Sequence, residues 1–257
     1  MSGLKDIHKL GKLLLDAGLI ECTVVVGYQL SYPEQLIMEL KPEECMKLQE
    51  DGLYTCCIKN PKPERKMLTH GKADGEFIRD NVPMTKEEVR EVSICKLKLY
   101  EGAVVYDIGS GTGSIAVEIA GLSDEIKVFA LEYKEEAISL ITQNKEKFEL
   151  NNIEIVSGKA PDALENLPVP THAFIGGSGG KMKEILSALY QKNPHMRVVM
   201  NAISMETICE MKEVLSTFSI QNADVVQMQV SRAKRVGAYH LMQAENPVWI
   251  CSFDFSG

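Results

Sequence analysis

The chain has 257 residues, of which 45% are hydrophobic and 6% aromatic, and its formal net charge is −8 at pH 7. This length allows one full α/β core with a smaller unit beside it. The acidic balance argues against a general binder of nucleic acid or of membrane surfaces, because such proteins carry a positive surface.

The first sixty residues have the pattern of a small α+β unit. Spaced leucines predict a helix over residues 4–19, and apolar runs predict strands over residues 22–30, 35–40 and 53–60, with a short helix near residues 42–49. Proline, lysine and glycine crowd the stretch that follows. We therefore expect one unit over residues 1–62 and a linker over residues 63–84.

From residue 85 the apolar pattern becomes a regular alternation of strands and helices. Thr85 is placed to cap a helix over residues 85–99, with Glu88 three residues on. Five strands then alternate with helices as far as residue 218, and two β-rich runs, 224–230 and 247–255, close the chain. Such alternation predicts a mostly parallel, Rossmann-like sheet over residues 85–257, with its ligand site at the carboxyl ends of the strands.

Three glycines alternate in the stretch YDIGSGTGSIAVEIA, directly after the first of these strands. A dinucleotide fingerprint starting at Gly109 fails at Ser114, whereas one starting at Gly111 meets Ala116, which its relaxed form accepts. No G-K-[ST] closes the turn, so a phosphate loop is excluded. The spacing by itself leaves a dinucleotide site open.

The fuller match is the pattern D-x-G-x-G-x-G, which resembles the first motif of class I S-adenosylmethionine-dependent methyltransferases. Glycines let the backbone pass close to the methionine end of the cofactor, and the next helix offers amide donors to its carboxylate. Glu132 closes the second strand, where an acidic side chain accepts the ribose hydroxyls, and Ala160 follows the third strand, near the adenine ring. Asp107 is expected near the sulfonium.

Five further motifs narrow the family. PMTKEEVR, GKAPDALENLP, FIGGSGG, NAISMET and NPVWICS, in this order, resemble the C15-methylating, C12-decarboxylating methyltransferases of cobalamin biosynthesis over residues 77–255. This resemblance favours S-adenosylmethionine over a dinucleotide. The upstream stretch GKLLLDAGLIECTVVVGYQLSYPEQLIMEL is similar to the C-terminal part of the corrin C5-methyltransferases, which are often fused to the C15 enzymes.

The resemblance implies two sets of site residues. Those expected to bind the cofactor are Thr85, Asp107, Gly109, Ser110, Gly111, Thr112, Gly113, Glu132 and Ala160. Those expected to bind the substrate are Gly176, Gly177, Gly179, Asn201 and Arg232. Thr85 could equally serve only as the cap of the following helix. Asn201 could equally be a turn residue without a role in substrate binding. Arg232 belongs to a cationic run, which could equally be a solvated face of the protein. Its guanidinium could bind a substrate carboxylate through two hydrogen bonds.

The implied substrate is an anionic tetrapyrrole, and the expected assembly is a homo-oligomer, a tetramer by family resemblance. Methyl transfer from a sulfonium depends on alignment and exclusion of water, so we expect no single obligatory acid or base. Seven cysteines without a C-x-x-C pair predict reduced thiols and no metal site, and the absence of a long apolar run or signal core predicts a cytoplasmic protein without a membrane partner. The alternatives are a class I methyltransferase of RNA or protein, and a non-catalytic cofactor-binding module.

Overall fold

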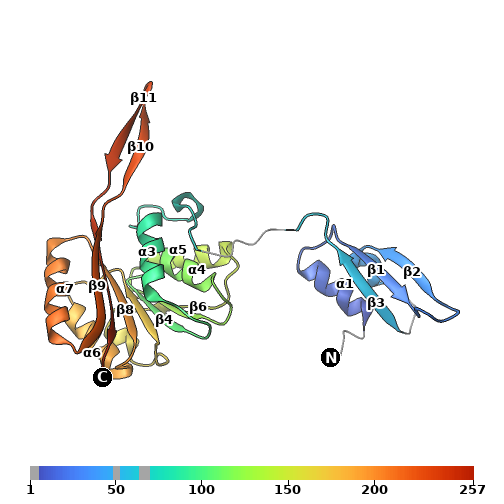
Figure 1. Ribbon diagram of the computed structural model, residues 1–257, viewed down its shortest axis with the longest axis horizontal. Helices are drawn as coiled ribbons and strands as arrows, with labels where there is room; N and C mark the ends of the chain where they lie inside the picture. The colour runs from blue at the N-terminus through green and yellow to red at the C-terminus, as the bar shows by residue number, and fades with distance from the viewer. Residues whose placement is uncertain (1–5, 49–52, 64–69) are drawn as a thin grey trace. The chain divides into compact units, whose positions relative to one another are not determined.

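The computed structural model describes residues 6–48, 53–63 and 70–257, and the chain divides into two compact units, Met1–Met67 and Leu68–Gly257 (Figure 1). The division falls inside the stretch predicted to be a linker. Within the described ranges, no helix is long and apolar enough to cross a membrane.

The smaller unit is a three-stranded antiparallel sheet with two helices. Its elements are α1 (Ile7–Asp16), β1 (Thr23–Tyr28), β2 (Leu36–Leu40), α2 (Pro42–Cys45) and β3 (Tyr54–Lys59), and the strand order is β2-β1-β3. Asp6 caps α1 by accepting hydrogen bonds from the backbone amides of His8 and Lys9. A small core joins α1, β1 and α2, so every predicted element of this unit is present with shorter bounds.

The larger unit is built on a seven-stranded sheet of order β6-β5-β4-β7-β8-β12-β9. Its strands are β4 (Val104–Ile108), β5 (Lys127–Glu132), β6 (Ile153–Ser157), β7 (His172–Ile175), β8 (Arg197–Ala202), β9 (Ile220–Met228) and β12 (Val248–Phe255). The first five are parallel, whereas β12 runs antiparallel to both β8 and β9. The expected α/β fold with a mostly parallel sheet is confirmed.

Helices cover both faces of this sheet (Figure 1). They are α3 (Glu87–Leu97), α4 (Ser114–Ala120), α5 (Glu135–Lys147), α6 (Met182–Lys192) and α7 (Met205–Thr217), with short 3₁₀ turns at Asp74–Glu76 and Asp162–Leu164. One core packs α3, α4 and α5 against the sheet, and the other packs α6 and α7. Adjacent residues of β4 serve opposite cores, Val105 the first and Tyr106 the second, as the two-residue period of a strand requires.

A hairpin of two strands, β10 (Ser231–Val236) and β11 (Tyr239–Ala244), stands out from the body of the larger unit between β9 and β12 (Figure 1). Residues 231–237 were expected only to form a cationic run, and the hairpin was not predicted. Every residue of both strands is exposed, so these strands have no buried face from which a pattern of period two could be read.

Residues 70–86, which we call the strap, precede α3 and pack on the larger unit. The backbone amides of Gly71 and Lys72 donate to the buried Glu118 of α4, at 3.0 and 2.7 Å, and Phe77 is buried. Most of the stretch predicted to be a linker therefore belongs to this unit. Thr85 does not cap α3: the helix begins at Glu87 with Lys86 as its N-cap, and the Glu87 amide donates to the Asp74 side chain at 3.0 Å.

Arg90 of α3 is fully buried and binds four groups, three of them in the strap and one, Glu118, in α4. Its guanidinium donates to Glu118 (3.1 Å), to Asp74 (3.2 Å), to the Thr85 carbonyl (2.7 Å) and to the Lys72 carbonyl. The guanidinium carbon also lies 4.6 Å from the ring centre of Phe77. Its burial and these partners make Arg90 an internal clamp.

We predict that Arg90→Met lowers the free energy of unfolding of the larger unit by about 3 to 5 kcal/mol, because Glu118 then stays buried without a counter-charge. Urea unfolding followed by the fluorescence of Trp249, the single tryptophan, measures this change. Lys183→Met is the matched control: it breaks an exposed pair with Glu213 and is expected to change little. Equal effects of the two substitutions would contradict the clamp.

His172 lies at the start of β7, buried beside Tyr100 at a ring-centre distance of 5.1 Å. Burial and the charge of Arg197 together lower the pKa of His172 to about 4, although Asp254 and a backbone hydrogen bond oppose the shift. The folded protein therefore keeps this imidazole neutral at pH values where the unfolded chain protonates it.

The unfolding free energy is expected to fall as the pH drops from about 6.5 to about 4, with His172 contributing about 3 kcal/mol of that loss. In His172→Phe this contribution is absent, and the difference in pH dependence between the two proteins isolates it from other titrating groups. Urea unfolding at several pH values, read from Trp249, makes the comparison. Parallel pH profiles would refute the neutral histidine.

Candidate active site

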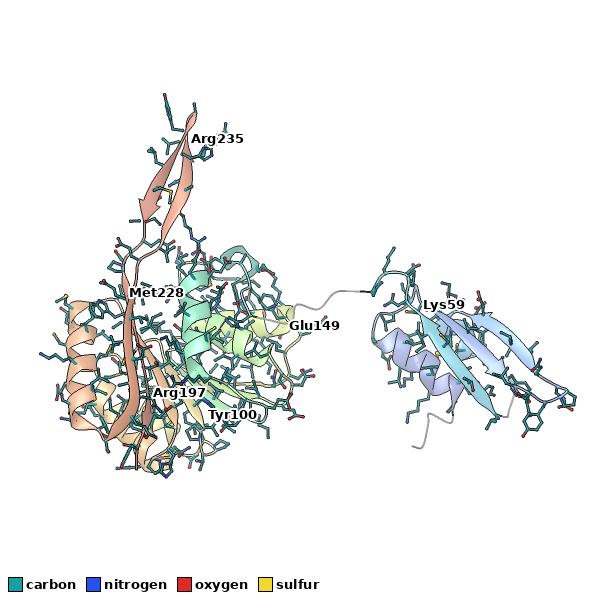
Figure 2. The ribbon with its side chains drawn as sticks, viewed as in Figure 1. Lys59, Tyr100, Glu149, Arg197, Met228 and Arg235 are labelled. Carbon is teal, nitrogen blue, oxygen red and sulfur yellow. The ribbon has the colours of Figure 1, made fainter. Side chains whose placement is uncertain are left out.

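A cleft of the larger unit opens at the carboxyl ends of β4, β5, β7 and β8 and has a volume of about 1080 Å³. Chain order reverses between β4 and β7, which are neighbours in the sheet, and open α/β sheets bind ligands at such a point. Met228, where β9 ends below the hairpin, lines the cleft, whereas Arg197 and Tyr100 lie toward the opposite end of the sheet (Figure 2).

Two glycine turns meet at the floor of the cleft. Gly109 follows β4 with φ +71°, and a Cβ there would lie 2.8 Å from the carbonyl oxygen of Gly177, after β7. Gly111 has φ +57°, and a Cβ there would lie 3.1 Å from the carbonyl oxygen of Pro83 in the strap. Only glycine meets both the positive φ and the close backbone approach. The turn is therefore held between β7 and the strap.

Glu132 ends β5 beside this turn, with 8% of its surface exposed. One carboxylate oxygen accepts from the Gly111 amide at 3.1 Å, and the other accepts from the amides of Tyr133 (2.8 Å) and Lys134 (3.1 Å). These bonds fix the carboxylate on the cleft wall. Ala160 lines the same part of the cleft, so these residues and Gly109–Gly111 form what we call the donor lobe.

Asp107 lies beneath the turn and is fully buried, so it does not line the cleft. Burial, with a smaller contribution from the charge of Glu132, raises the pKa of Asp107 to about 7, although hydrogen bonds from Ser110 (2.6 Å) and the Ala116 amide oppose the shift. A cation bound in the donor lobe would favour the ionised form of this carboxyl.

The acceptor lobe is the other half of the cleft, lined by Gly176–Gly179, Lys181, Asn201–Ser204 and Gln243–Asn246. Asn201 is mostly buried and donates to Ser93 of α3 at 3.0 Å. The Ser93 hydroxyl in turn donates to the Val89 carbonyl at 2.7 Å. Residues 243–246 come from the base of the hairpin, which therefore forms part of the wall.

Most of the site residues predicted from the sequence meet in this one cleft. Its lining includes Thr85, Gly109, Ser110, Gly111, Glu132, Ala160, Gly176, Gly177, Gly179 and Asn201. Thr112 and Gly113 belong to the glycine turn but do not line the cleft, and Gly113 packs on Ile141 of α5.

Arg232 is not brought to the cleft wall. Its guanidinium pairs with Glu88 at 2.5 Å and with Glu245 at 3.4 Å. The guanidinium that was expected to bind the substrate is therefore paired with two carboxylates of the protein, Glu88 of α3 and Glu245 at the base of the hairpin. Arg232 and Glu88 are 144 residues apart in the chain, so no local sequence pattern predicts their pairing.

Sequence reasoning missed three lysines of the cleft. Lys134, Lys159 and Lys181 each line it, and none forms an ion pair with any residue that the structure describes. Lys159 also lies 4.5 Å from the ring centre of Tyr133. Each lysine directly follows the end of a predicted strand or a glycine turn, and this position alone could have indicated that it lines the ligand site.

The donor lobe fits S-adenosylmethionine. The glycine turn exposes backbone without a Cβ, Glu132 offers carboxylate oxygens at the cleft wall, and Ala160 leaves room for a flat ring. No group of three or more histidine, cysteine or acidic side chains suited to a metal ion occurs in the part of the chain that the structure describes.

Comparison with known proteins identifies the family. The model of the precorrin methyltransferase domain matches residues 76–253. The chain belongs to this family. Two relatives are similar over most of their length: the probable cobalt-precorrin-6B C(15)-methyltransferase (decarboxylating) of Pyrobaculum calidifontis (38% identical; 71% of this chain and 94% of the relative), and the cobalt-precorrin-6B C(15)-methyltransferase (decarboxylating) of Salmonella typhimurium (34%; 69% and 92%).

Solved structures agree with this assignment. The precorrin-6Y C5,15-methyltransferase of Geobacter metallireducens is 33% identical, with a TM-score of 0.69 over 74% of this chain and 98% of its own. An S-adenosylmethionine-dependent O-methyltransferase of Thermotoga maritima, 14% identical, shares the fold (TM-score 0.59; 91% and 93%). The expected class I methyltransferase fold and its cofactor, S-adenosylmethionine, are confirmed. The smaller unit lies largely outside the family match.

We predict that Glu132→Gln weakens S-adenosylmethionine binding by roughly ten- to a hundredfold, because hydrogen bonds to a charged group contribute about 1.5 to 3 kcal/mol. Isothermal titration calorimetry measures the dissociation constant. Glu154→Gln, an exposed change on the neighbouring strand β6, serves as the control and should leave affinity unchanged. Equal affinities of the wild type and Glu132→Gln would remove this carboxylate from the cofactor site.

Proposed function

We propose that this methyltransferase transfers a methyl group to C15 of a precorrin-6B-type tetrapyrrole and catalyses loss of the C12 acetate carboxyl group as carbon dioxide, in cobalamin biosynthesis. The observation that carries the proposal is the two-lobed cleft of about 1080 Å³ at the strand-order reversal. Relatives that share 34 to 38% of their residues with this chain carry that activity in their names.

Bound S-adenosylmethionine supplies a methyl group already activated by its sulfonium. The donor lobe would orient this group: Glu132, held by the Gly111 amide, would accept hydrogen bonds from the ribose hydroxyls, and the glycine turn would let the methionine end approach the backbone. The glycines at 176, 177 and 179 let a flat macrocycle approach the backbone of the acceptor lobe. Alignment of the acceptor carbon with the sulfonium and exclusion of water then provide the rate enhancement.

The substrate carries several carboxylates, and Lys134, Lys159 and Lys181 are the cations of the cleft that no described carboxylate neutralises. We propose that these lysines, rather than Arg232, attract the acidic side arms. Each presents a flexible ammonium group, which suits side arms at variable positions.

The described residues that line the cleft include no histidine and no cysteine. We propose that the reaction relies on positioning, without a single obligatory acid or base. The π-system of the macrocycle provides the electron pair that binds the methyl carbon as the carbon–sulfur bond breaks. When the acetate C–C bond breaks, the same π-system takes up the released pair and is afterwards protonated, and carbon dioxide leaves.

We further propose that the protein acts in the cytoplasm as a homo-oligomer, a tetramer by family resemblance, without nucleic acid as a partner. The smaller unit is proposed to resemble the C-terminal part of the corrin C5-methyltransferases and to support assembly.

Incubation with S-adenosylmethionine and either precorrin-6B or its cobalt form, followed by mass spectrometry, tests the proposal. We expect the product to gain one methyl group and lose carbon dioxide, and Glu132→Gln to slow its formation at limiting cofactor. Cofactor binding without this product, from either substrate, would leave the fold in place and overturn the acceptor. A non-catalytic module predicts the same negative result with every acceptor tried.

A further inference from the structure

Asn144 of α5 is fully buried and joins two segments that are far apart in the chain. Its side-chain oxygen accepts from the Ile78 amide at 2.8 Å, and its amide group donates to the carbonyls of Ile78 (2.8 Å) and Thr112 (2.9 Å). Ile78 belongs to the strap, and Thr112 belongs to the glycine turn. One side chain therefore ties the strap to the turn.

These two segments form neighbouring walls of the donor lobe. Strap residues 82–86 line the cleft on one side and Gly109–Gly111 on another, and the Pro83 carbonyl lies against Gly111. Gly113, next to Thr112, packs on Ile141, which precedes Asn144 by three residues on the same helix. The face of α5 that carries both residues thus supports the turn from behind.

We infer that Asn144 is a positioning residue for binding of the methyl donor. By holding the strap and the glycine turn at one separation, it forms the donor lobe before the cofactor arrives. A preformed site binds more tightly because less order must be imposed on binding. The inference rests on the proposed function only in requiring that S-adenosylmethionine is the ligand of this lobe.

Asn152 provides a matched control for a purely structural role. Its amide donates to three backbone carbonyls, those of Ala120 (2.9 Å), Ser123 (3.0 Å) and Ile126 (2.9 Å), and none of these residues lines the cleft. Asn144→Ala and Asn152→Ala therefore each remove three hydrogen bonds to backbone, but only the first releases the strap from the turn.

Calorimetric titration of S-adenosylmethionine into the wild type and both variants tests the inference. Both variants are expected to have a lower Tm, and only Asn144→Ala to bind the cofactor about tenfold more weakly or worse, which corresponds to about 1.4 kcal/mol. In the methyl transfer assay, the KM for the cofactor rises while kcat stays within about twofold. Unchanged affinity in folded Asn144→Ala, or equal weakening in both variants, overturns the positioning role. Failure of the wild type to bind overturns the proposed function instead.

Hydrogen exchange of the wild type decides the matter even where Asn144→Ala does not fold. S-adenosylmethionine is expected to slow exchange in peptides covering residues 77–86 and 109–113 together, because the two segments act as one wall unit. Slower exchange in the turn with no change in the strap would overturn the inference.

Discussion

The structure of the site depends on one steric constraint, the backbone-to-backbone contact of the turns that end β4 and β7. These strands are neighbours where the strand order reverses, so their following segments leave the sheet at the same place. A Cβ at Gly109 would lie 2.8 Å from the carbonyl of Gly177. Glycine at this contact lets both turns lie flat on the cleft floor, and it leaves exposed backbone for ligands to approach.

Buried polar groups then set the walls of the cleft. Glu132 draws three backbone amides around one carboxylate, Arg90 and Glu118 clamp the strap, and Asn144 joins the strap to the glycine turn. Each of these groups would be costly to bury without its partners. Because the fold provides hydrogen-bond partners for all of these groups, it also fixes the geometry of the donor lobe. The acceptor lobe instead has open glycines and Lys181, which forms no ion pair with any described residue, and this suits a large anionic substrate.

Much of the fold and of the donor lobe could be predicted from the sequence because the evidence for them is local. Apolar periodicity marks each strand and helix of the parallel part of the sheet, and Gly109, Gly111 and Glu132 stand directly at strand ends. The prediction that Thr85 caps α3 was wrong. The helix starts at Glu87, after Lys86, and the carbonyl of Thr85 instead accepts a hydrogen bond from Arg90.

The sequence by itself determined the order of the elements, the glycine turn, the acidic residue at the end of β5 and the resemblance to the family. Tertiary structure alone decided the antiparallel place of β12, the exposed hairpin, the packing of the strap and the pairing of Arg232 with Glu88 and Glu245. The physical reason is range. A turn or an amphipathic face follows from neighbouring residues, whereas an ion pair between residues 88 and 232, or one amide binding both residues 78 and 112, exists only once distant segments have packed.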